Sequence, residues 1–493
     1  MSSATSWCLF GLPLVVLAAC LLSRKRSKQY PPGPIGLPFL GHVLGMPRRE
    51  DWEEWASRYG DIVHISTFGK HIIMINSAQA AIDLLEKRSA IYSDRPHFPL
   101  IDLAGQGFNF GFMPYGKAWS SRRRTFAAYF GRSFPDIYPS HHSAVMHLLH
   151  NLRANPRDFM EHVRLHAAQV ILEVTYGLSV QSCEDRLVRN AEAVLSDVAM
   201  AVRPETWVLN PVMILHFLPG WLGGNFLARC VQQWQTNARE LWERPYKLAT
   251  ENDSRIYCFV QNLLDSRPPQ VSVESHTKLV MDSSAVAYGG GAETTTSAGN
   301  TFFLAMALYP DVQRLAYSEI VKVIGTGRLP DFSDRSNLPY ISAVAREIFR
   351  WNPPGPLGVP HLLTEEDFYC GYCLPKGSIV VSNIWHMTHD PTIYARPHDF
   401  EPERHLEGGK LVSEDSVRVS FGFGRRVCPG KAFAEDSLWL LVAQVLAVFE
   451  ISSIDSDVPR ASFSSSTFSQ PLPFRCDIKL RSEDSQALLG VAD

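Results

Sequence analysis

The sequence predicts a mainly α-helical fold with a small β portion, built as one large domain. Three observations support this prediction. Most periodic apolar patterns have helical spacing, the strand-like runs are few and short, and no low-complexity linker or internal repeat follows residue 50. The chain has 493 residues, of which 45% are hydrophobic and 20% are charged. That balance suits a globular protein with a large buried core.

The individual elements follow in chain order. Helical periodicity covers Asp51–Tyr59, Ala78–Lys87, Lys117–Phe130, His141–Leu152, Leu165–Tyr176 and Pro310–Ile324. Strand patterns cover Asp61–Thr67, His71–Asn76 and Ser378–Ser382. The segment from Ser482 onward is small and polar, and we expect it to fray.

An uncharged apolar segment from Trp7 to Leu22 predicts a single transmembrane helix over residues 1–23. About 20 apolar residues span a bilayer, and roughly 17 is the lower limit. Basic residues follow at once, at Arg24–Arg26 and Lys28. A cleaved signal peptide, the alternative, carries its positive charge before the apolar run. Because basic clusters stay on the cytoplasmic side, we expect a retained anchor with the body of the protein in the cytosol.

A basic and proline-rich hinge is predicted over residues 24–49, before a domain that covers residues 50–493. Prolines at Pro31–Pro34 and Pro38 stiffen the hinge, because proline fixes φ and cannot continue a helix. A rigid spacer here sets how the body is oriented against the bilayer. An inert linker remains the alternative.

Charge and cysteine content exclude other classes of protein. The net charge of −3 gives no support to nucleic-acid binding. Nine cysteines are scattered without a regular framework, which indicates free thiols in a reducing compartment. Cys370 and Cys373 form a CxxC pair, but no second pair follows to complete a zinc site. We therefore assign that pair a structural role.

The run Phe421–Gly430 carries the strongest signal in the chain. Gly422 and Gly424 imply a tight loop whose backbone approaches another group closely. Cys428 follows, shortly before an apolar helix predicted over Phe433–Phe449. Backbone N–H groups and the dipole at a helix N-terminus favour a thiolate, which is the form that binds metals. For an isolated Cys-Pro-Gly, a buried structural cysteine is the better interpretation.

A long apolar helix predicted over Ser284–Leu308 contains the consecutive glycines Gly289–Gly291, followed by Glu293 and Thr294. Each glycine costs a helix about 1 kcal/mol relative to alanine, so three in a row need a reason. Close approach of a flat ligand or of dioxygen to the backbone is one such reason. The alternative is a core helix that glycine makes less stable and that carries polar residues by chance.

Two further motifs place charged residues one turn from a partner. Glu347 and Arg350 form an ExxR on a predicted helix, and Arg404 follows in Phe-Glu-Pro-Glu-Arg. Trp119 and Arg123 form a WxxxR on another helix. Alone, an ExxR carries little weight, because exposed pairs of this spacing are common on protein surfaces.

Taken together, these motifs resemble those of the cytochrome P-450 family. Phe421, Gly424, Arg426, Cys428 and Gly430 match every fixed position of its haem-binding loop, FxxGxRxCxG. A ten-residue match of this kind is highly specific, and the resemblance covers nearly the whole chain. Within the family, the sequence is most similar to fungal microsomal enzymes of secondary metabolism, of the type that resembles O-methylsterigmatocystin oxidoreductase.

The resemblance implies a cytochrome P-450 fold that binds haem b, with Cys428 as the axial ligand of the iron. It also implies that Trp119, Arg123 and Arg426 hold the haem propionates, which suits the pairing of guanidinium with carboxylate. Many relatives carry arginine where His361 stands. An imidazole in contact with a propionate makes haem binding dependent on pH near neutrality.

The glycine-rich helix resembles the family motif (A/G)Gx(D/E)T(T/S), which implies that Glu293 and Thr294 are catalytic and supply protons for cleavage of the O–O bond. By the same resemblance, Glu347, Arg350 and Arg404 form a buried structural cluster. Loss of one partner in such a cluster costs roughly 3–5 kcal/mol. His405 replaces the more usual phenylalanine after Arg404, and we expect this change to matter little.

The resemblance also places a substrate pocket. Its aromatic character suits an apolar ligand, and a plain core role for the phenylalanines is the alternative. The expected lining residues are Phe98, Phe108, Phe110, Phe112, Ala285, Leu357, Val359 and Phe468.

The implied activity is that of a monooxygenase, which uses O2 and electrons from NADPH to hydroxylate or epoxidise a small apolar molecule. A terpenoid is the first expectation and a polyketide-derived aromatic the second. The chain has no G-x-G-x-x-G fingerprint followed by an acid, so the electrons require an NADPH–cytochrome reductase. We expect the protein to be a monomer whose anchor contacts the lipid of the endoplasmic reticulum membrane.

Two alternative functions remain. A haem-thiolate isomerase or dehydratase uses no dioxygen, and the pair Glu293 and Thr294 argues against it. A haem sensor or carrier without enzymatic activity needs neither this pair nor a membrane anchor beside a reductase.

Overall fold

The computed structural model describes residues 29–36, 42, 49–67, 69–133, 135–203, 224–251, 257–412, 415–454 and 461–490. The predicted transmembrane helix over residues 1–23 lies outside these residues, as does most of the predicted hinge. Among the described residues, no helix combines the length and the apolar character that crossing a bilayer requires.

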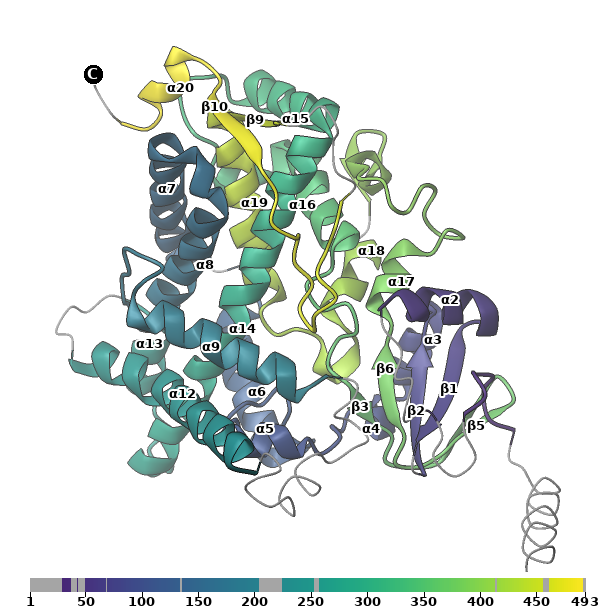
Figure 1. The fold of residues 1–493 in the computed structure, drawn as a ribbon. Helices are drawn as coiled ribbons and strands as arrows, with labels where there is room; N and C mark the ends of the chain where they lie inside the picture. The colour runs from purple at the N-terminus through teal and green to yellow at the C-terminus, as the bar shows by residue number, and fades with distance from the viewer. Residues whose placement is uncertain are drawn as a thin grey trace, which may run out of the picture.

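Long helices packed side by side form most of the molecule (Figure 1). The central helix α14 contacts α8, α16 and α19, and α7 packs against α8 and α19. Helix α19 is apolar on all sides and almost completely buried, as expected for a helix that is surrounded by others. The bounds of these helices are α7 Tyr138–Ala154, α8 Phe159–Tyr176, α14 Val273–Leu308, α16 Pro339–Trp351 and α19 Lys431–Val448.

Further helices surround this bundle. Helices α9 and α12 pack against each other and cover one end of α14 (Figure 1). These surrounding helices are α2 Arg49–Tyr59, α3 Ala78–Ala81, α4 Ser89–Tyr92, α5 Pro99–Leu103, α6 Lys117–Phe130, α9 Arg186–Ala201, α12 Gly224–Glu251, α13 Phe259–Asp265, α15 Pro310–Val323, α17 Ile384–His389, α18 Asp415–Arg418 and α20 Glu483–Ala487.

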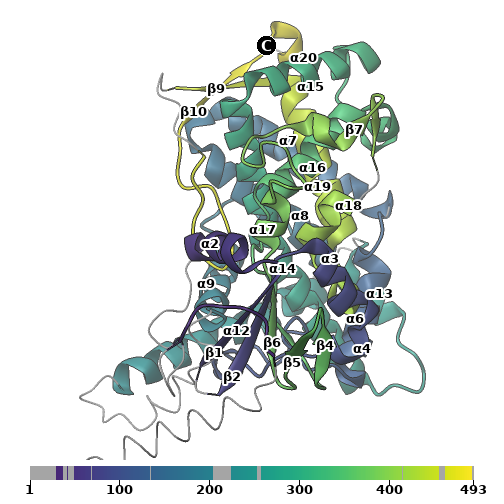
Figure 2. The same ribbon diagram turned by 90° about the vertical axis from the view of Figure 1, so that its right-hand side faces the viewer.

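The largest sheet of the described residues has the strand order β1-β2-β6-β3. Figure 2 shows β1, β2 and β6 side by side, with α2 beyond one end of the sheet. Strand β2 runs parallel to β6, and β3 then pairs antiparallel with β6, which brings His361 opposite Val380. The strands are β1 Ile62–Thr67, β2 Lys70–Ile75, β3 His361–Leu362, β4 Asp367–Tyr369, β5 Tyr372–Leu374, β6 Ile379–Ser382, β7 Leu406–Glu407, β8 Lys410–Leu411, β9 Phe449–Ser453 and β10 Cys476–Leu480.

The predicted class, mainly helical with a small β portion, is confirmed. Two local expectations differ from the structure. The helix predicted over Ala78–Lys87 changes from α-helix to π-helix at Ile82. The segment after Ser482 is not frayed as far as Gly490, because the Ser482 hydroxyl caps α20 and Leu489 is buried.

The CxxC pair belongs to the hairpin between β4 and β5. Cys370 and Gly371 form its two-residue turn, with φ values of 49° and 82°. Cys370 is exposed and Cys373 is buried. Within the described part of the chain, no three metal-ligating side chains come together.

Candidate active site

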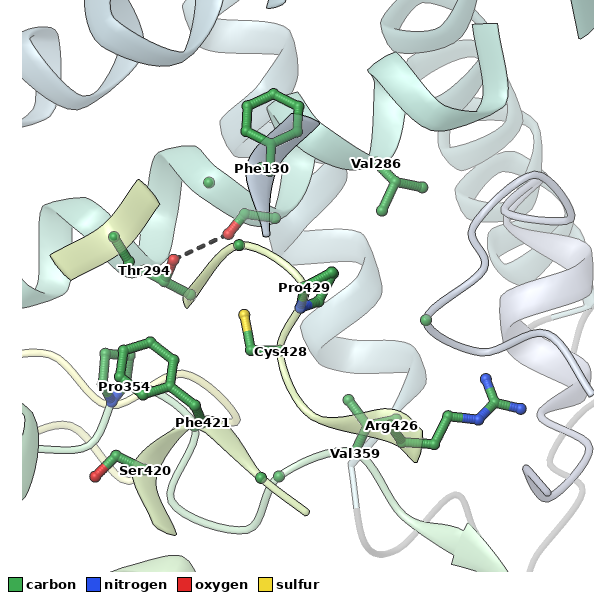
Figure 3. Close-up of a pocket in the computed structure, with 18 of the residues that line it drawn as sticks. Phe130, Val286, Thr294, Pro354, Val359, Ser420, Phe421, Arg426, Cys428 and Pro429 are labelled. Carbon is green, nitrogen blue, oxygen red and sulfur yellow. Dashed lines mark hydrogen bonds between the residues drawn. The ribbon is translucent and has the colours of Figure 1, made fainter. Parts of the chain in front are cut away.

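A cavity of about 340 Å³ lies beside α14, at the point where the loop before α19 approaches it. This volume is within the usual range for ligand pockets. Its wall is mainly apolar and includes Gly290, Gly291, Thr294 and Cys428. Figure 3 shows the Cys428 sulfur in the middle of the labelled lining residues.

The loop that carries Cys428 is held by its backbone. Gly422 and Gly424 have φ values of 82° and 58°, a region that favours glycine. A Cβ atom on Gly424 would collide with the carbonyl of Leu85. The N–H of Cys428 donates to the carbonyl of Phe421 at 2.8 Å, which closes the loop just before α19. The loop therefore presents Cys428 in a fixed position.

Cys428 is exposed to the cavity although protein surrounds it. Burial raises the pKa of the Cys428 thiol, while the N–H of Gly430 and the positive charge of Arg123 act in the opposite direction. A thiolate at this position would have a backbone donor beside it and the N-terminus of α19 behind it. These are the surroundings expected of a cysteine that ligates a metal.

Three arginines line the same cavity: Arg95, which is buried, and Arg123 and Arg426, which are half-buried. Among the described residues, none of them forms an ion pair with a carboxylate. Arg426 donates to the carbonyl of Ser93 at 2.8 Å, and its guanidinium lies 4.3 Å from the ring centroid of Trp119. Burial lowers the pKa of all three groups, in the case of Arg426 to about 10.

Buried cations of this kind require anionic partners. Two carboxylates in the cavity would satisfy these arginines, and haem b carries two propionates. The glycines of α14 also fit a flat ligand, since a Cβ atom added to Gly290 would meet no protein atom within 4 Å. By contrast, a Cβ on Gly291 would lie 3.0 Å from the side chain of Ile171. The residues present therefore fit haem b.

His361 is buried in the cavity wall. Its Nδ1 lies 2.7 Å from the carbonyl oxygen of Tyr92, so the N–H at Nδ1 is the donor. Burial and the positive charge of Arg95 hold the pKa of His361 well below its ordinary value. His361 thus lies beside Arg95 in the wall that would hold the propionates, and the pH dependence of haem binding stays a prediction.

Thr294 and Glu293 face different cavities. The Thr294 hydroxyl donates to the carbonyl of Gly290 at 2.9 Å, and Thr294 lines the main cavity (Figure 3). Glu293 instead lines a small cavity between α8, α9 and α14, and the side chain of Gln470 donates to its carboxylate. Burial raises the pKa of Glu293. Consecutive residues on a helix point about 100° apart, so the structure does not bring the acid and the alcohol together.

The structure places only some of the residues expected to line the substrate pocket in the wall of the main cavity. Phe110 and Val359 line the main cavity, whereas six other residues do not: Phe98, Phe108, Phe112, Ala285, Leu357 and Phe468. The apolar side chains found in the wall include Phe126, Phe130, Ile171, Val286, Ala287 and Pro354.

The physical reasons for these differences are local. Phe98 packs edge-on against Phe112, with the ring centroids 5.9 Å apart, and Phe98 and Phe108 belong to the buried core. On α14, Ala285 is packed within the helical core and the next two residues face the cavity. Leu357 lies between Gly355 and Gly358, whose backbones form that part of the wall.

The charged cluster around Glu347 contains one residue more than expected. Arg350 donates to both carboxylate oxygens of Glu347, at 2.7 and 2.8 Å, and Arg404 donates to Oε1 at 3.1 Å. His405 Nε2 lies 2.8 Å from the other oxygen, Oε2, and His405 is fully buried. The expectation that His405 matters little is therefore wrong, because its ring satisfies part of a buried carboxylate.

Replacing His405 by phenylalanine should destabilise the protein by about 1–3 kcal/mol, the usual cost of leaving a buried acceptor without its donor. The change is measured as a lower Tm of the haem-loaded protein. His97→Phe is the matched control, since its imidazole also contacts a carboxylate, Asp102 at 2.7 Å, but both side chains are exposed. Equal Tm values for the two variants would contradict a role for His405.

A cysteine and three arginines that form no ion pair among the described residues, all around one cavity, are the features expected of a haem-thiolate oxidoreductase. The family model for cytochrome P-450 matches residues 31–476. The chain therefore belongs to the cytochrome P-450 family, and it is a monooxygenase that uses haem b, O2 and electrons derived from NADPH.

Similar proteins come from several fungi. Cytochrome P-450 monooxygenase 208 of Postia placenta is 37% identical over 96% of both chains. Cytochrome P-450 monooxygenase COX1 of Coprinopsis cinerea is 35% identical over 99% of both chains. Cytochrome P-450 monooxygenase ppsD of Aspergillus oryzae is 38% identical over 98% of this chain and 95% of its own.

Proposed function

We propose that this monooxygenase hydroxylates or epoxidises a small apolar secondary metabolite. For hydroxylation, R–H, O2, NADPH and H+ give R–OH, NADP+ and H2O. The observation that carries the proposal is a mainly apolar cavity with Cys428 and Thr294 in its wall. Phe110, Val286 and Val359 line it as well, which suits a terpenoid first and a polyketide-derived aromatic second.

Haem b bound in this cavity would supply the iron at which dioxygen is activated. Cys428 would hold that iron through its thiolate, and Arg95, Arg123 and Arg426 would hold the propionates. The Thr294 hydroxyl, fixed by the carbonyl of Gly290, would pass a proton from its Oγ1 to the reacting oxygen. The apolar wall would exclude water and so limit loss of reduced oxygen.

The electrons come, in this proposal, from an NADPH–cytochrome reductase. Arg425, which is exposed beside Cys428, offers positive charge to an acidic donor, whereas Lys431 pairs with Glu435. We further propose a monomer that is held in the endoplasmic reticulum membrane by one transmembrane helix over residues 1–23. The hinge at 24–49 would then connect this anchor to a catalytic domain, residues 50–493, in the cytosol.

The direct test is to incubate the full-length protein with a reductase, NADPH and a panel of terpenoids, followed by aromatic polyketides. The expected product is one oxygen atom heavier than its substrate and carries label from isotopically labelled O2. A rearranged or dehydrated product without that label would support an isomerase or dehydratase instead.

Replacing Thr294 by alanine should leave haem bound but divert reducing equivalents to hydrogen peroxide. Product formed per NADPH should fall by about tenfold or more, because a positioned proton donor contributes 10²–10⁴-fold. Ser284→Ala on the same helix is the control, since that hydroxyl bonds to the carbonyl of Met281 and lines neither cavity. Unchanged coupling in Thr294→Ala would show that Thr294 does not deliver protons.

A further inference from the structure

The carboxylate of Glu293 is held by a turn that is distant in sequence. The side-chain amide of Gln470 donates to Glu293 Oε1. Gln470 lies in a turn that the isolated bridge between Phe463 and Pro471 closes. Within it, the N–H of Ser464 donates to the carbonyl of Gln470 at 2.7 Å, and the N–H of Gln470 donates to the Ser464 hydroxyl at 3.1 Å. The backbone of Gln470 is therefore fixed, and its side chain reaches α14.

The same turn is attached to the wall of the main cavity. The N–H of Ser469 donates to the carbonyl of Pro354 at 3.0 Å, and Pro354 lines that cavity. The Ser469 carbonyl accepts from the hydroxyl of Ser297, which lies one turn after Glu293 on α14, at 2.6 Å. At the tip of the turn, Thr467 donates to the carbonyl of Ala199 in α9 at 3.0 Å. The turn that carries Gln470 is thus linked to the wall at Pro354.

The small cavity beside Glu293 leads toward the surface. Its volume is about 10 Å³, which is close to the minimum space for one water molecule. Arg164 and Glu192 line it and form an ion pair of 3.1 Å, and more than a third of each of these side chains is exposed. The hydroxyl of Tyr288, another lining residue, is buried and has no hydrogen-bond partner among the described residues. A single water here would connect Glu293 with groups that exchange protons with solvent.

We infer that Gln470 is a positioning residue that holds the Glu293 carboxylate on the side of the small cavity. In the held position, Glu293 takes up a proton from solvent through the water beside Arg164 and Glu192. Glu293 then turns and gives that proton to Thr294 Oγ1, and Thr294 gives up its own hydroxyl proton. Without Gln470, Glu293 takes up protons less efficiently, so proton delivery slows. This inference rests on the proposed proton-delivery role of Glu293 and Thr294.

The test compares Gln470→Leu, Glu293→Gln and the double variant as full-length haem-loaded proteins with a reductase and NADPH. Without added substrate, reduced oxygen leaves either as hydrogen peroxide or as water, and slower proton delivery favours peroxide. Gln470→Leu should raise the peroxide share of the NADPH consumed by about twofold or more. It should also change the solvent deuterium isotope effect on NADPH oxidation.

The double variant separates a positioning role from a structural one. If Gln470 acts through Glu293, adding Gln470→Leu to Glu293→Gln should change the peroxide share no further. Independent effects of the two substitutions would overturn the inference. Ser466→Ala is the control. Among the described residues, the Ser466 hydroxyl bonds only to the carbonyl of Phe468, within the same turn. This variant should behave as the unmodified protein does.

Two outcomes distinguish this inference from the proposed function. If Glu293→Gln leaves the peroxide share unchanged, the proton role of Glu293 fails and the inference fails with it. If Glu293→Gln changes this share but Gln470→Leu does not, only the positioning role is overturned. If Gln470→Leu does not fold, Gln470→Asn is the second variant, because its side chain is shorter but keeps the amide. We expect it to shift the peroxide share in the same direction. A carbon monoxide difference spectrum of the thiolate type verifies that each variant is folded and loaded.

Discussion

Replacing Cys428 by alanine should abolish the red-shifted, thiolate-type Soret band of the reduced carbon monoxide complex and should stop turnover. The sulfur is the soft donor in the cavity wall, and thiolate donation is what favours cleavage of the O–O bond. We expect activity to fall by about a thousandfold or more, which corresponds to ~4 kcal/mol of activation free energy. The loop itself should persist, because it is closed by the backbone bond from Cys428 to Phe421.

Two further variants make this result specific. Cys373→Ala removes a buried thiol in β5 and should keep the full spectrum and activity. Cys428→His offers the iron an imidazole, so a folded, haem-loaded protein with an imidazole-type band is expected. A thiolate-type band in Cys428→Ala would mean that another cysteine is the ligand.

The second large effect is expected at Glu347. Its carboxylate accepts from Arg350, Arg404 and His405, and Glu347 and Arg350 have no exposed surface. Glu347→Gln keeps the shape of the side chain but leaves the buried Arg350 without its counter-charge. Breaking a buried pair in this way costs roughly 3–5 kcal/mol. The yield of haem-loaded protein should therefore drop sharply, and the urea midpoint of the remainder should fall.

Asp311→Asn provides the control for this prediction. Asp311 also pairs with an arginine three residues away, Arg314 at 3.0 Å, but both side chains are largely exposed. Exposed pairs contribute about 0–1 kcal/mol, so this variant should unfold at nearly the same urea concentration as the unmodified protein. A similarly small shift for Glu347→Gln would show that the cluster does not stabilise the fold.

Features encoded by neighbouring residues were predictable from the sequence. The loop before α19 was found because its two glycines, its cysteine and its proline follow one another directly. Helix α6 was predicted with its observed bounds, Lys117–Phe130, because its apolar residues repeat with helical spacing. The ExxR on α16 was also found, but its burial became evident only from the structure.

Features that depend on distant partners were not predictable. Arg95 donates to the carbonyls of Val359 and Pro360, more than 260 positions away, and nothing in its local sequence marks it as part of the cavity. Gln470 meets Glu293 in the same manner. On α14, an error of one residue rotates a side chain by about 100°, which is why Ala285 was assigned to a wall that Val286 forms.

The arginines around the cavity have a consequence for how this protein matures. The charges of these arginines repel one another, since Arg123 lowers the pKa of both Arg95 and Arg426, and Arg426 lowers the pKa of Arg95. The two acidic groups of haem would relieve this repulsion, so cofactor loading and completion of the fold are thermodynamically linked. A cell short of haem should consequently accumulate less of this polypeptide, because quality control would remove the unloaded form.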